Sequence, residues 1–311
     1  MKGIAVFYKP KNWSSYDVIR FLKKELNEKK IGHGGTLDPL AEGVLIIGIK
    51  REGTKRLAQF LKEKDKEYIA TIILGGVSET FDVEGEISYL EVKKWPTEEK
   101  IKKCLKKFKG KILQVPPPYS AVKISGKSAY KLARIGKKLE LKPREVFVSE
   151  IQLLDYRLLK EKLLEIKVRL KVKSGFYVRS FANDFGKILN TGGVLKELLR
   201  TQVGEFKIKE AITIEDFKRQ NLELYFKVCS LVSKTDLKFF VKKLAALLKI
   251  SGRMNLEDDG IEIIAQGQER NLQEFLDKVL KSSLIEAKDS FYYFRKPQAY
   301  YHKFDETLKN C

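Results

Sequence analysis

The chain has 311 residues, of which 43% are hydrophobic and 33% charged, and a formal net charge of +21. This length allows one large domain and a smaller one, with a sizeable buried core. Apolar runs such as 43–49 are far shorter than the roughly 20 residues that span a bilayer, and residues 1–12 lack the plan of a signal peptide. We therefore expect a cytoplasmic protein that does not use a membrane.

Metal and disulfide chemistry are not expected. The three cysteines stand at positions 104, 229 and 311, and the two histidines are His33 and His302. This spacing matches neither a set of zinc ligands nor a disulfide framework. We expect a reducing compartment and a reaction that needs no metal.

The positive charge is concentrated in one part of the chain. Residues 100–142 carry 14 Lys or Arg side chains and one acid, whereas residues 219–311 carry 16 basic and 13 acidic side chains. Such a surplus repels itself unless a polyanion or counterions offset it. A solvated surface, or one built on ion pairs, would alternate acids with the lysines, and residues 100–142 do not. The pattern predicts a polyanion contact in the first part of the chain.

The first hundred residues alternate between strand and helix patterns. "GIAVFY" (3–8) predicts a strand, and the helix that follows has Ser14 and Asp17 at the spacing of a capping box. We expect Thr54 to cap a later helix. Strands are predicted on either side of that helix, at 43–49 and 66–74, and a hairpin at 81–87.

The middle of the chain begins with a predicted helix capped by Thr97, whose apolar stripe places Cys104 in the core. A proline-stiffened loop then leads to a short helix that ends at Gly136. Alternating patterns predict two paired antiparallel strands at 144–158 and 162–173. A helix is expected near 180–189. A change of composition after about residue 218 marks the expected domain boundary.

The loop "GHGGTLDPL" (32–40) precedes a continuous apolar run. Its glycines permit positive φ or close backbone approach, and Pro39 favours an extended Asp38 whose carboxylate projects from the turn. Taken alone, an Asp before Pro is more often a turn or capping residue, and His33 a structural histidine. The spacing matches neither a dinucleotide fingerprint nor a P-loop.

This loop closely resembles the catalytic segment of the bacterial TruB family, the tRNA pseudouridine-55 synthases. Further matching blocks are "YKPKNWSSYDV", "DKEYIATIILG", "ETFDVEGEI", "QVPPPYSAVKISGKSAYKLAR", "SGFYVRSFANDFG" and "LLRTQVGEF". They keep the family's order over about two hundred residues. The resemblance implies a mixed, largely antiparallel sheet with helices on its faces.

The family reaction isomerises uridine to pseudouridine. The bond between base and sugar breaks, the base turns, and its C5 joins the same sugar carbon, so no redox change, metal or cofactor is required. A carboxylate acts as nucleophile or base, and a nearby cation keeps it ionised. The resemblance implies that Asp38 is the carboxylate and Arg179 its ion-pair partner. Without the resemblance, Arg179 would pass as an ordinary surface or strand-edge arginine.

The resemblance also implies the substrate contacts. Tyr68 lies against the target base, Tyr177 packs at the site, and Leu198 belongs to its apolar floor. His33 enters the opened RNA loop and helps to hold the flipped base out of its stack. By sequence alone the two tyrosines and the leucine would pass as core residues.

Lys9 and Pro10 match a block that supports the catalytic loop, and Lys9 is also counted among the expected substrate contacts. The basic stretch at about 110–140 matches an insertion that folds over the RNA arm, and Lys123, Lys127 and Lys131 are its expected phosphate contacts. Two departures bear on substrate fit: Phe176 replaces the common Thr, and Leu199 replaces the usual Arg.

The C-terminal part, 229–311, resembles an acylphosphatase, a ferredoxin-like β-α-β-β-α-β domain, instead of the PUA domain that most of the family carries. Asn255 matches the asparagine that positions water in that family. Leu231 stands where the phosphate-binding arginine is expected, in a loop without glycine, so the backbone anion cradle is lost. We expect this domain to be inactive.

The sequence therefore predicts an α/β (α+β) protein with a pseudouridine synthase domain at 1–218 and a ferredoxin-like domain at 229–311. The expected function is conversion of uridine 55 in the T loop of tRNA by base flipping, by a monomer. Two alternatives stay open. One is a non-catalytic tRNA-binding or folding protein on the same scaffold, and the other is an acyl phosphate hydrolase.

Overall fold

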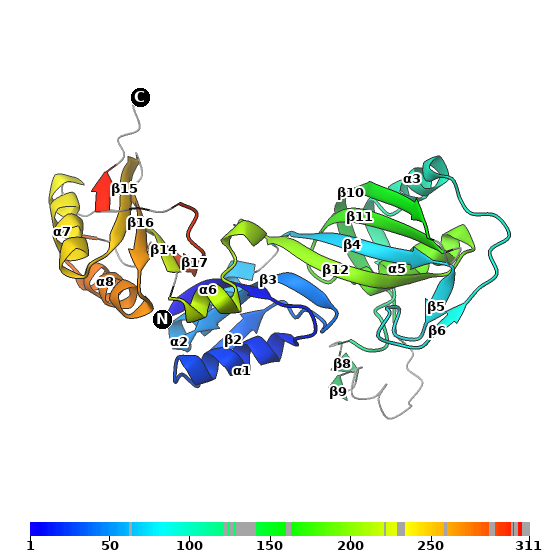
Figure 1. Cartoon of the computed structure of the whole chain (residues 1–311), viewed down its shortest axis with the longest axis horizontal. Coiled ribbons are helices and arrows are strands. Elements are labelled where there is room, and N and C mark those ends of the chain that lie inside the picture. Colours follow the sequence, from blue (N-terminus) through cyan, green and yellow to red (C-terminus); the bar gives the residue numbers. More distant parts are fainter. Residues whose placement is uncertain are drawn as a thin grey trace. The chain divides into compact units, whose positions relative to one another are not determined.

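The computed structural model forms two compact units, one of Met1–Lys62 with Glu205–Cys311 and one of Glu63–Gly204 (Figure 1). It describes all residues except 62–63, 121–122, 125–126, 129–140, 160–162, 221, 229–233, 258–259, 286–289, 300, 302–303 and 307–311.

The first unit begins with a small three-stranded arrangement. Strand β3 (Ala41–Ile49) lies between β1 (Gly3–Lys9) and β2 (Ile31–Gly34), and both pair with it in the antiparallel sense. Along β1 the register runs from Gly3 opposite Ile49 to Lys9 opposite Gly43. Helices α1 (Ser15–Glu25) and α2 (Lys50–Leu61) complete this part.

Of the two predicted capping residues in this part, one is confirmed and the other is wrong. Ser14 caps α1 through a full capping box with Asp17, which confirms the prediction. The prediction that Thr54 caps a helix is wrong, because α2 begins four residues earlier. The Thr54 hydroxyl donates back to the Lys50 carbonyl at 2.9 Å, which is the bond of a residue inside a helix.

The C-terminal residues form a β-α-β-β-α-β fold, which confirms the predicted ferredoxin-like class. Its strands lie in the order β15, β16, β14, β17, with antiparallel neighbours. Helices α7 and α8 cover one face, to which alternate strand residues contribute a continuous apolar core (Figure 1). The elements are β14 (Leu222–Val228), α7 (Lys234–Leu247), β15 (Ser251–Glu257), β16 (Gly260–Gly267), α8 (Glu269–Lys281) and β17 (Phe291–Arg295).

Short elements surround this fold. The first strand of the fold, β14, starts at Leu222, ahead of the predicted boundary at residue 229. Asn255 is buried on β15, where its amide donates to Glu262. Leu231 lies outside the described residues, so the loss of hydrolase activity stays a prediction. The short elements are β13 (Phe206–Lys207), the 3₁₀ helix η1 (Ile208–Glu210), α6 (Ile214–Lys218) and β18 (Phe304–Glu306).

Strand β17 joins the C-terminal fold to the start of the chain. It runs parallel to β1, with Tyr293 opposite Ile4. Beside this pairing the Arg295 guanidinium contacts two buried carboxylates, Glu223 at 2.5 Å and Glu210 at 2.8 Å. These contacts explain why the first 62 residues form one compact unit with the C-terminal part. The change of composition, by contrast, places a domain boundary near residue 218.

The second unit is built on a five-stranded antiparallel sheet in the order β12, β4, β11, β10, β7. Two short hairpins, β5–β6 and β8–β9, form separate two-stranded sheets. The long alternating strands were predicted correctly. The elements are β4 (Lys66–Leu74), β5 (Gly76–Ser78), β6 (Ile87–Tyr89), α3 (Glu98–Lys106), β7 (Gly110–Gln114), β8 (Lys123–Ile124), β9 (Lys127–Ser128), β10 (Arg144–Leu158), β11 (Leu164–Val172), α5 (Val178–Leu189) and β12 (Gly193–Val203).

Phe108, two residues after the end of α3, packs against aromatic rings of α5. The Phe108 ring lies 5.0 Å from that of Phe181 and 6.0 Å from that of Phe185, measured between centroids. Thr97 caps α3 as predicted. Cys104 is buried, which confirms it as a core residue, and burial raises the pKa of its thiol.

We predict that Glu223→Ala lowers the free energy of unfolding by about 3–5 kcal/mol, because it leaves the buried Arg295 charge with one carboxylate fewer. Glu223→Gln keeps an acceptor for Arg295 and should cost less. Urea unfolding of both variants measures the difference. A loss below about 1 kcal/mol for the alanine variant would show that this ion pair does not hold the fold.

Candidate active site

Asp38 lies in the short loop between β2 and β3, and the residue before it is fixed by helix α1. The Ser15 hydroxyl accepts a hydrogen bond from the Leu37 N–H at 2.9 Å and donates one to the Leu37 carbonyl at 3.1 Å. Ser15 and Leu37 are both buried, whereas Asp38 is partly exposed. The loop is thus tied down while its carboxylate stays accessible.

The residue after Asp38 is held from β1. The Lys9 ammonium is fully buried and donates to the carbonyls of Pro10 at 3.0 Å, Pro39 at 3.4 Å and Trp13. The Asn12 N–H also donates to the Pro39 carbonyl, at 2.9 Å. These are the contacts of a residue that supports the loop, and any direct contact of Lys9 with substrate stays a prediction.

His33 lies on β2, opposite Ile47 of β3, five residues before Asp38. Its side chain is partly exposed. Gly35, directly after this strand, has a φ of +79°, which glycine adopts without strain. The chain can therefore leave β2 sharply and enter the anchored loop.

Arg179 lies in the first turn of α5, and its guanidinium is buried among oxygen atoms of the second unit. Its Nη1 is 3.4 Å from Asp82 Oδ2 and donates to the Thr80 carbonyl at 3.2 Å, while Nη2 donates to the Tyr119 carbonyl at 2.7 Å. Asp82 is almost fully buried and accepts from the Thr80 hydroxyl at 2.6 Å. Asp38 belongs to the other unit, so the ion pair between Asp38 and Arg179 stays a prediction.

The start of α5 is also fixed through its backbone. The Gln114 side chain accepts from the Tyr177 N–H at 2.8 Å and donates to the Tyr177 carbonyl at 3.0 Å. The Ser180 hydroxyl donates to the Val115 carbonyl at 2.7 Å. Because Gln114 and Ser180 are buried, these bonds hold Tyr177 and Arg179 against the end of β7.

Tyr68 and Leu198 lie on one face of the sheet of the second unit. Tyr68 of β4 is opposite Arg200 of β12, and Leu198 is opposite Ala70, two residues further along β4. Side chains two residues apart point to the same face, and all four are buried. The structure therefore brings the expected base-contacting tyrosine and the expected floor residue together on neighbouring strands.

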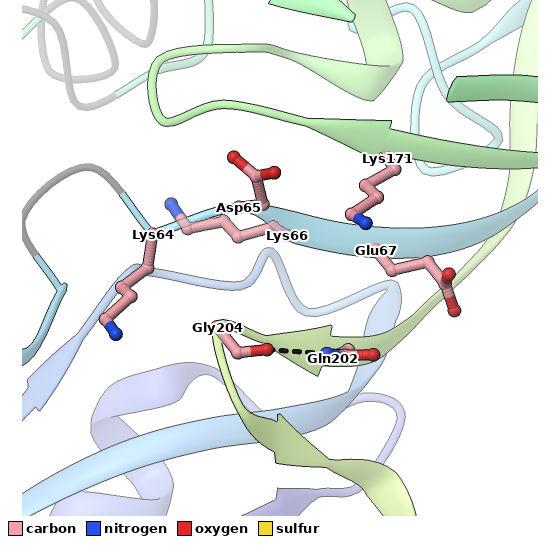
Figure 2. Close-up of a pocket in the computed structure, with 7 residues that line it drawn as sticks. All are labelled: Lys64, Asp65, Lys66, Glu67, Lys171, Gln202 and Gly204. Atoms are coloured by element: carbon pink, nitrogen blue, oxygen red, sulfur yellow. Dashed lines mark hydrogen bonds between the residues drawn. The ribbon is translucent and has the colours of Figure 1, made fainter. Parts of the chain in front are cut away.

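A cavity of about 340 Å³ lies where β4 begins, two residues before Tyr68 (Figure 2). Burial lowers the pKa of Lys66, and Arg200 adds to that effect while Tyr68 opposes it. Within the lining, the Gln202 amide donates to the Gly204 carbonyl at 2.6 Å. Neither Asp38 nor Arg179 lines this cavity. The lining residues are Lys64, Asp65, Lys66, Glu67, Lys171, Gln202 and Gly204.

The expected RNA contacts of the basic insertion are described only in part. Lys123 and Lys127 lie on the paired strands β8 and β9. Lys131, like the helix expected to end at Gly136, lies outside the described residues.

Phe176, one of the two residues that depart from the family pattern, packs on Phe181, with ring centroids 6.1 Å apart.

Comparison with known proteins identifies the family. The model of the TruB family pseudouridylate synthase N-terminal domain matches residues 23–178. The tRNA pseudouridine synthase B of Francisella tularensis is 42% identical over 224 residues, which cover 72% of each chain. That of Clostridium tetani is 38% identical and covers 72% of this chain and 75% of its own. The chain belongs to the TruB family of pseudouridylate synthases.

The family fold is also seen in a crystal structure of a Cbf5–Nop10–Gar1 complex. One of its chains matches with a TM-score of 0.52 at 24% identity, covering 84% of this chain and 70% of that chain. Among the described residues, none of the helices combines the length and the hydrophobicity that a membrane span requires. The same residues contain no group of three or more His, Cys, Asp or Glu side chains that could hold a metal ion.

Sequence reasoning missed three residues that hold candidate site residues or their neighbours within each unit. Ser15, Asp82 and Gln114 fix Leu37, Arg179 and Tyr177 respectively. All three stand inside the blocks that carry the family resemblance. Their place inside these blocks was the signal available from the sequence.

We predict that Ser15→Ala lowers the rate of catalysis about 10–100-fold with little change in RNA affinity, because displacement of a reacting group by a fraction of an ångström is costly. Ser14→Ala is the matched control, since its hydroxyl caps α1 and does not contact the loop. Single-turnover assays with both variants measure the effect. Equal rates for the two would show that the anchoring of Leu37 does not position Asp38.

Proposed function

We propose that this chain, acting as a monomer, converts uridine 55 in the T loop of tRNA to pseudouridine, with Asp38 as the catalytic carboxylate. The N1–C1′ bond breaks and a C5–C1′ bond forms. The proton of C5 leaves to water and N1 gains a proton, so atoms and electrons balance without an external reactant. The tRNA substrate is taken from the names of the Francisella and Clostridium relatives.

The observation that carries this proposal is the anchoring of the Asp38 loop. Leu37 and Pro39, on either side of Asp38, have their carbonyls bound by Ser15 and Lys9. A carboxylate on such a loop loses little conformational freedom when it meets the sugar or the base, as nucleophilic or general-base catalysis requires. A turn residue without a chemical role would not need two buried polar side chains to hold its neighbours.

Arg179 is proposed to be the cation that keeps Asp38 ionised and oriented. Its guanidinium is held by Asp82 and by the carbonyls of Thr80 and Tyr119. Guanidinium has five N–H donors in a fixed plane, so these contacts can set its orientation while a further carboxylate is bound. Asp82 thereby acts as a positioning residue.

The remaining side chains are proposed to bind the flipped nucleotide. Tyr68 stacks against the uracil, with Leu198 beside it and Tyr177 at the start of α5. His33 enters the space that the base leaves in the RNA loop. Extruding a base costs a few kcal/mol, and stacking on an aromatic ring offsets part of that cost.

The contact with tRNA is proposed to include the basic insertion. Lys123, Lys127 and Lys131 contribute phosphate contacts, which give affinity without reading sequence. The second candidate function is a non-catalytic tRNA-binding or folding protein on this scaffold. The anchored Asp38 favours the enzyme over the binder.

We predict that Asp38→Asn abolishes tritium release from tRNA labelled at C5 of uridine, while tRNA affinity changes by no more than a few-fold. Asparagine keeps the shape of the side chain and removes its charge. The assay counts released tritium and maps pseudouridine in the product. Turnover near that of the unchanged protein would support the binding function instead.

A second prediction concerns Arg179→Ala, which should leave less than about 1% of the activity. It also leaves the buried Asp82 without this cation, at a cost of several kcal/mol, so folding is checked by circular dichroism. Arg169→Ala is the control, because among the described residues this arginine of the same unit makes one side-chain hydrogen bond, an exposed one to Gln152. Equal activity of the two variants would rule out Arg179 as the partner of Asp38.

A further inference from the structure

Helix α3 carries an exposed row of lysines that the proposed site does not use. We define the α3 lysine surface as Lys100, Lys103 and Lys106 of α3 together with Lys107 and Lys109 directly after it, all of which are exposed. None of them forms an ion pair with a described residue. The two neighbouring lysines that do are Lys102, 2.6 Å from Glu98, and Lys111, 3.2 Å from Glu145.

The charge pattern of α3 exceeds what the helix needs for its own stability. Glu98 and Glu99 stand in its first turn, and Lys103 and Lys106 in its last, which suits the helix dipole. Lys103, however, is three residues from both Lys100 and Lys106, so like charges adjoin along one side. Such pairs destabilise a helix by about 0.2–0.5 kcal/mol each. A bound polyanion would turn this repulsion between lysines into a net attraction to the ligand.

The opposite side of α3 is fixed to the protein. Ile101, Cys104 and Leu105 are buried, and Phe108, two residues after α3, packs against the rings of Phe181 and Phe185 of α5. Because Arg179 lies in the first turn of α5, the α3 lysine surface belongs to a segment that packs against the helix presenting a proposed catalytic group. A ligand bound there is held by a rigid element, not by a mobile tail.

We propose that the α3 lysine surface binds the phosphate backbone of a helical stem of the RNA substrate. This rests on the proposed function, because the ligand is part of the RNA that brings the uridine. Lysines at one-turn spacing match a row of phosphates and carry no base specificity. The only aromatic residue of 97–111 is Phe108, which is buried, so the stacking platform typical of single-strand binding is missing from α3.

The test compares two triple variants in a salt series. Lys103, Lys106 and Lys107 are replaced together by Gln, and the matched control replaces Lys243, Arg270 and Lys281, three exposed cations of the C-terminal fold. Each lost phosphate contact flattens the slope of log K against log salt by about 0.7–0.9. We expect the α3 variant to weaken tRNA binding and to flatten the slope by about one to two units, and the control to change it less.

Two further measurements separate binding from chemistry and from folding. At saturating tRNA the α3 variant should form pseudouridine at the unchanged rate, and its urea midpoint should not fall. A duplex RNA competitor should lose more affinity for it than a single strand of equal length. Slopes equal to the control, or an equal loss for both competitors, would overturn the proposal. If the unchanged protein makes no pseudouridine but the slopes still differ, only the proposed enzyme function fails.

Discussion

A buried ammonium group at the end of β1 sets the geometry on which the Asp38 loop depends. Burying a lysine charge is unfavourable unless its donors are satisfied, and Lys9 directs them to the carbonyls of Pro10, Trp13 and Pro39. The segment at residues 10–13 and the loop at Pro39 are thereby bound to the same ammonium group. The loop that carries Asp38 cannot move without exposing these carbonyls or leaving the charge unsatisfied, so the electrostatic constraint becomes a positional one.

The same strand links the anchored loop to the C-terminal fold. β1 pairs with β3 along its whole length and with β17 at Ile4 and Ala5. The Arg295 group, with Glu210 and Glu223, reinforces the junction. The β-α-β-β-α-β fold is therefore a lateral extension of the strands that support the loop. Even without a chemical activity, it stabilises the strand on which Lys9 stands.

Local patterns predicted most elements, because they depend on nearby residues. The capping box of Ser14 and the alternation in 144–158 are properties of short segments, and both were predicted correctly. Contacts between distant residues carry no such signal. The bond of Ser15 to Leu37 spans 22 residues, and the pair of Asp82 with Arg179 joins a hairpin connection to a helix. The pairing of β17 with β1 was missed for the same reason, because a change in composition reflects charge and not strand pairing.

The energies within α3 explain how a helix tolerates a row of like charges. Fully burying an aliphatic or aromatic side chain contributes about 1.5–3 kcal/mol, and Ile101, Leu105 and Phe108 are all buried. Repulsion between adjacent lysines costs only about 0.2–0.5 kcal/mol per pair. The apolar side therefore determines that the helix forms and where it packs, while the exposed side has little influence on folding. The residues on the exposed side can therefore be chosen for what they bind. An excess of lysines on such a well-anchored helix indicates a ligand more strongly than the same excess on a poorly anchored helix would.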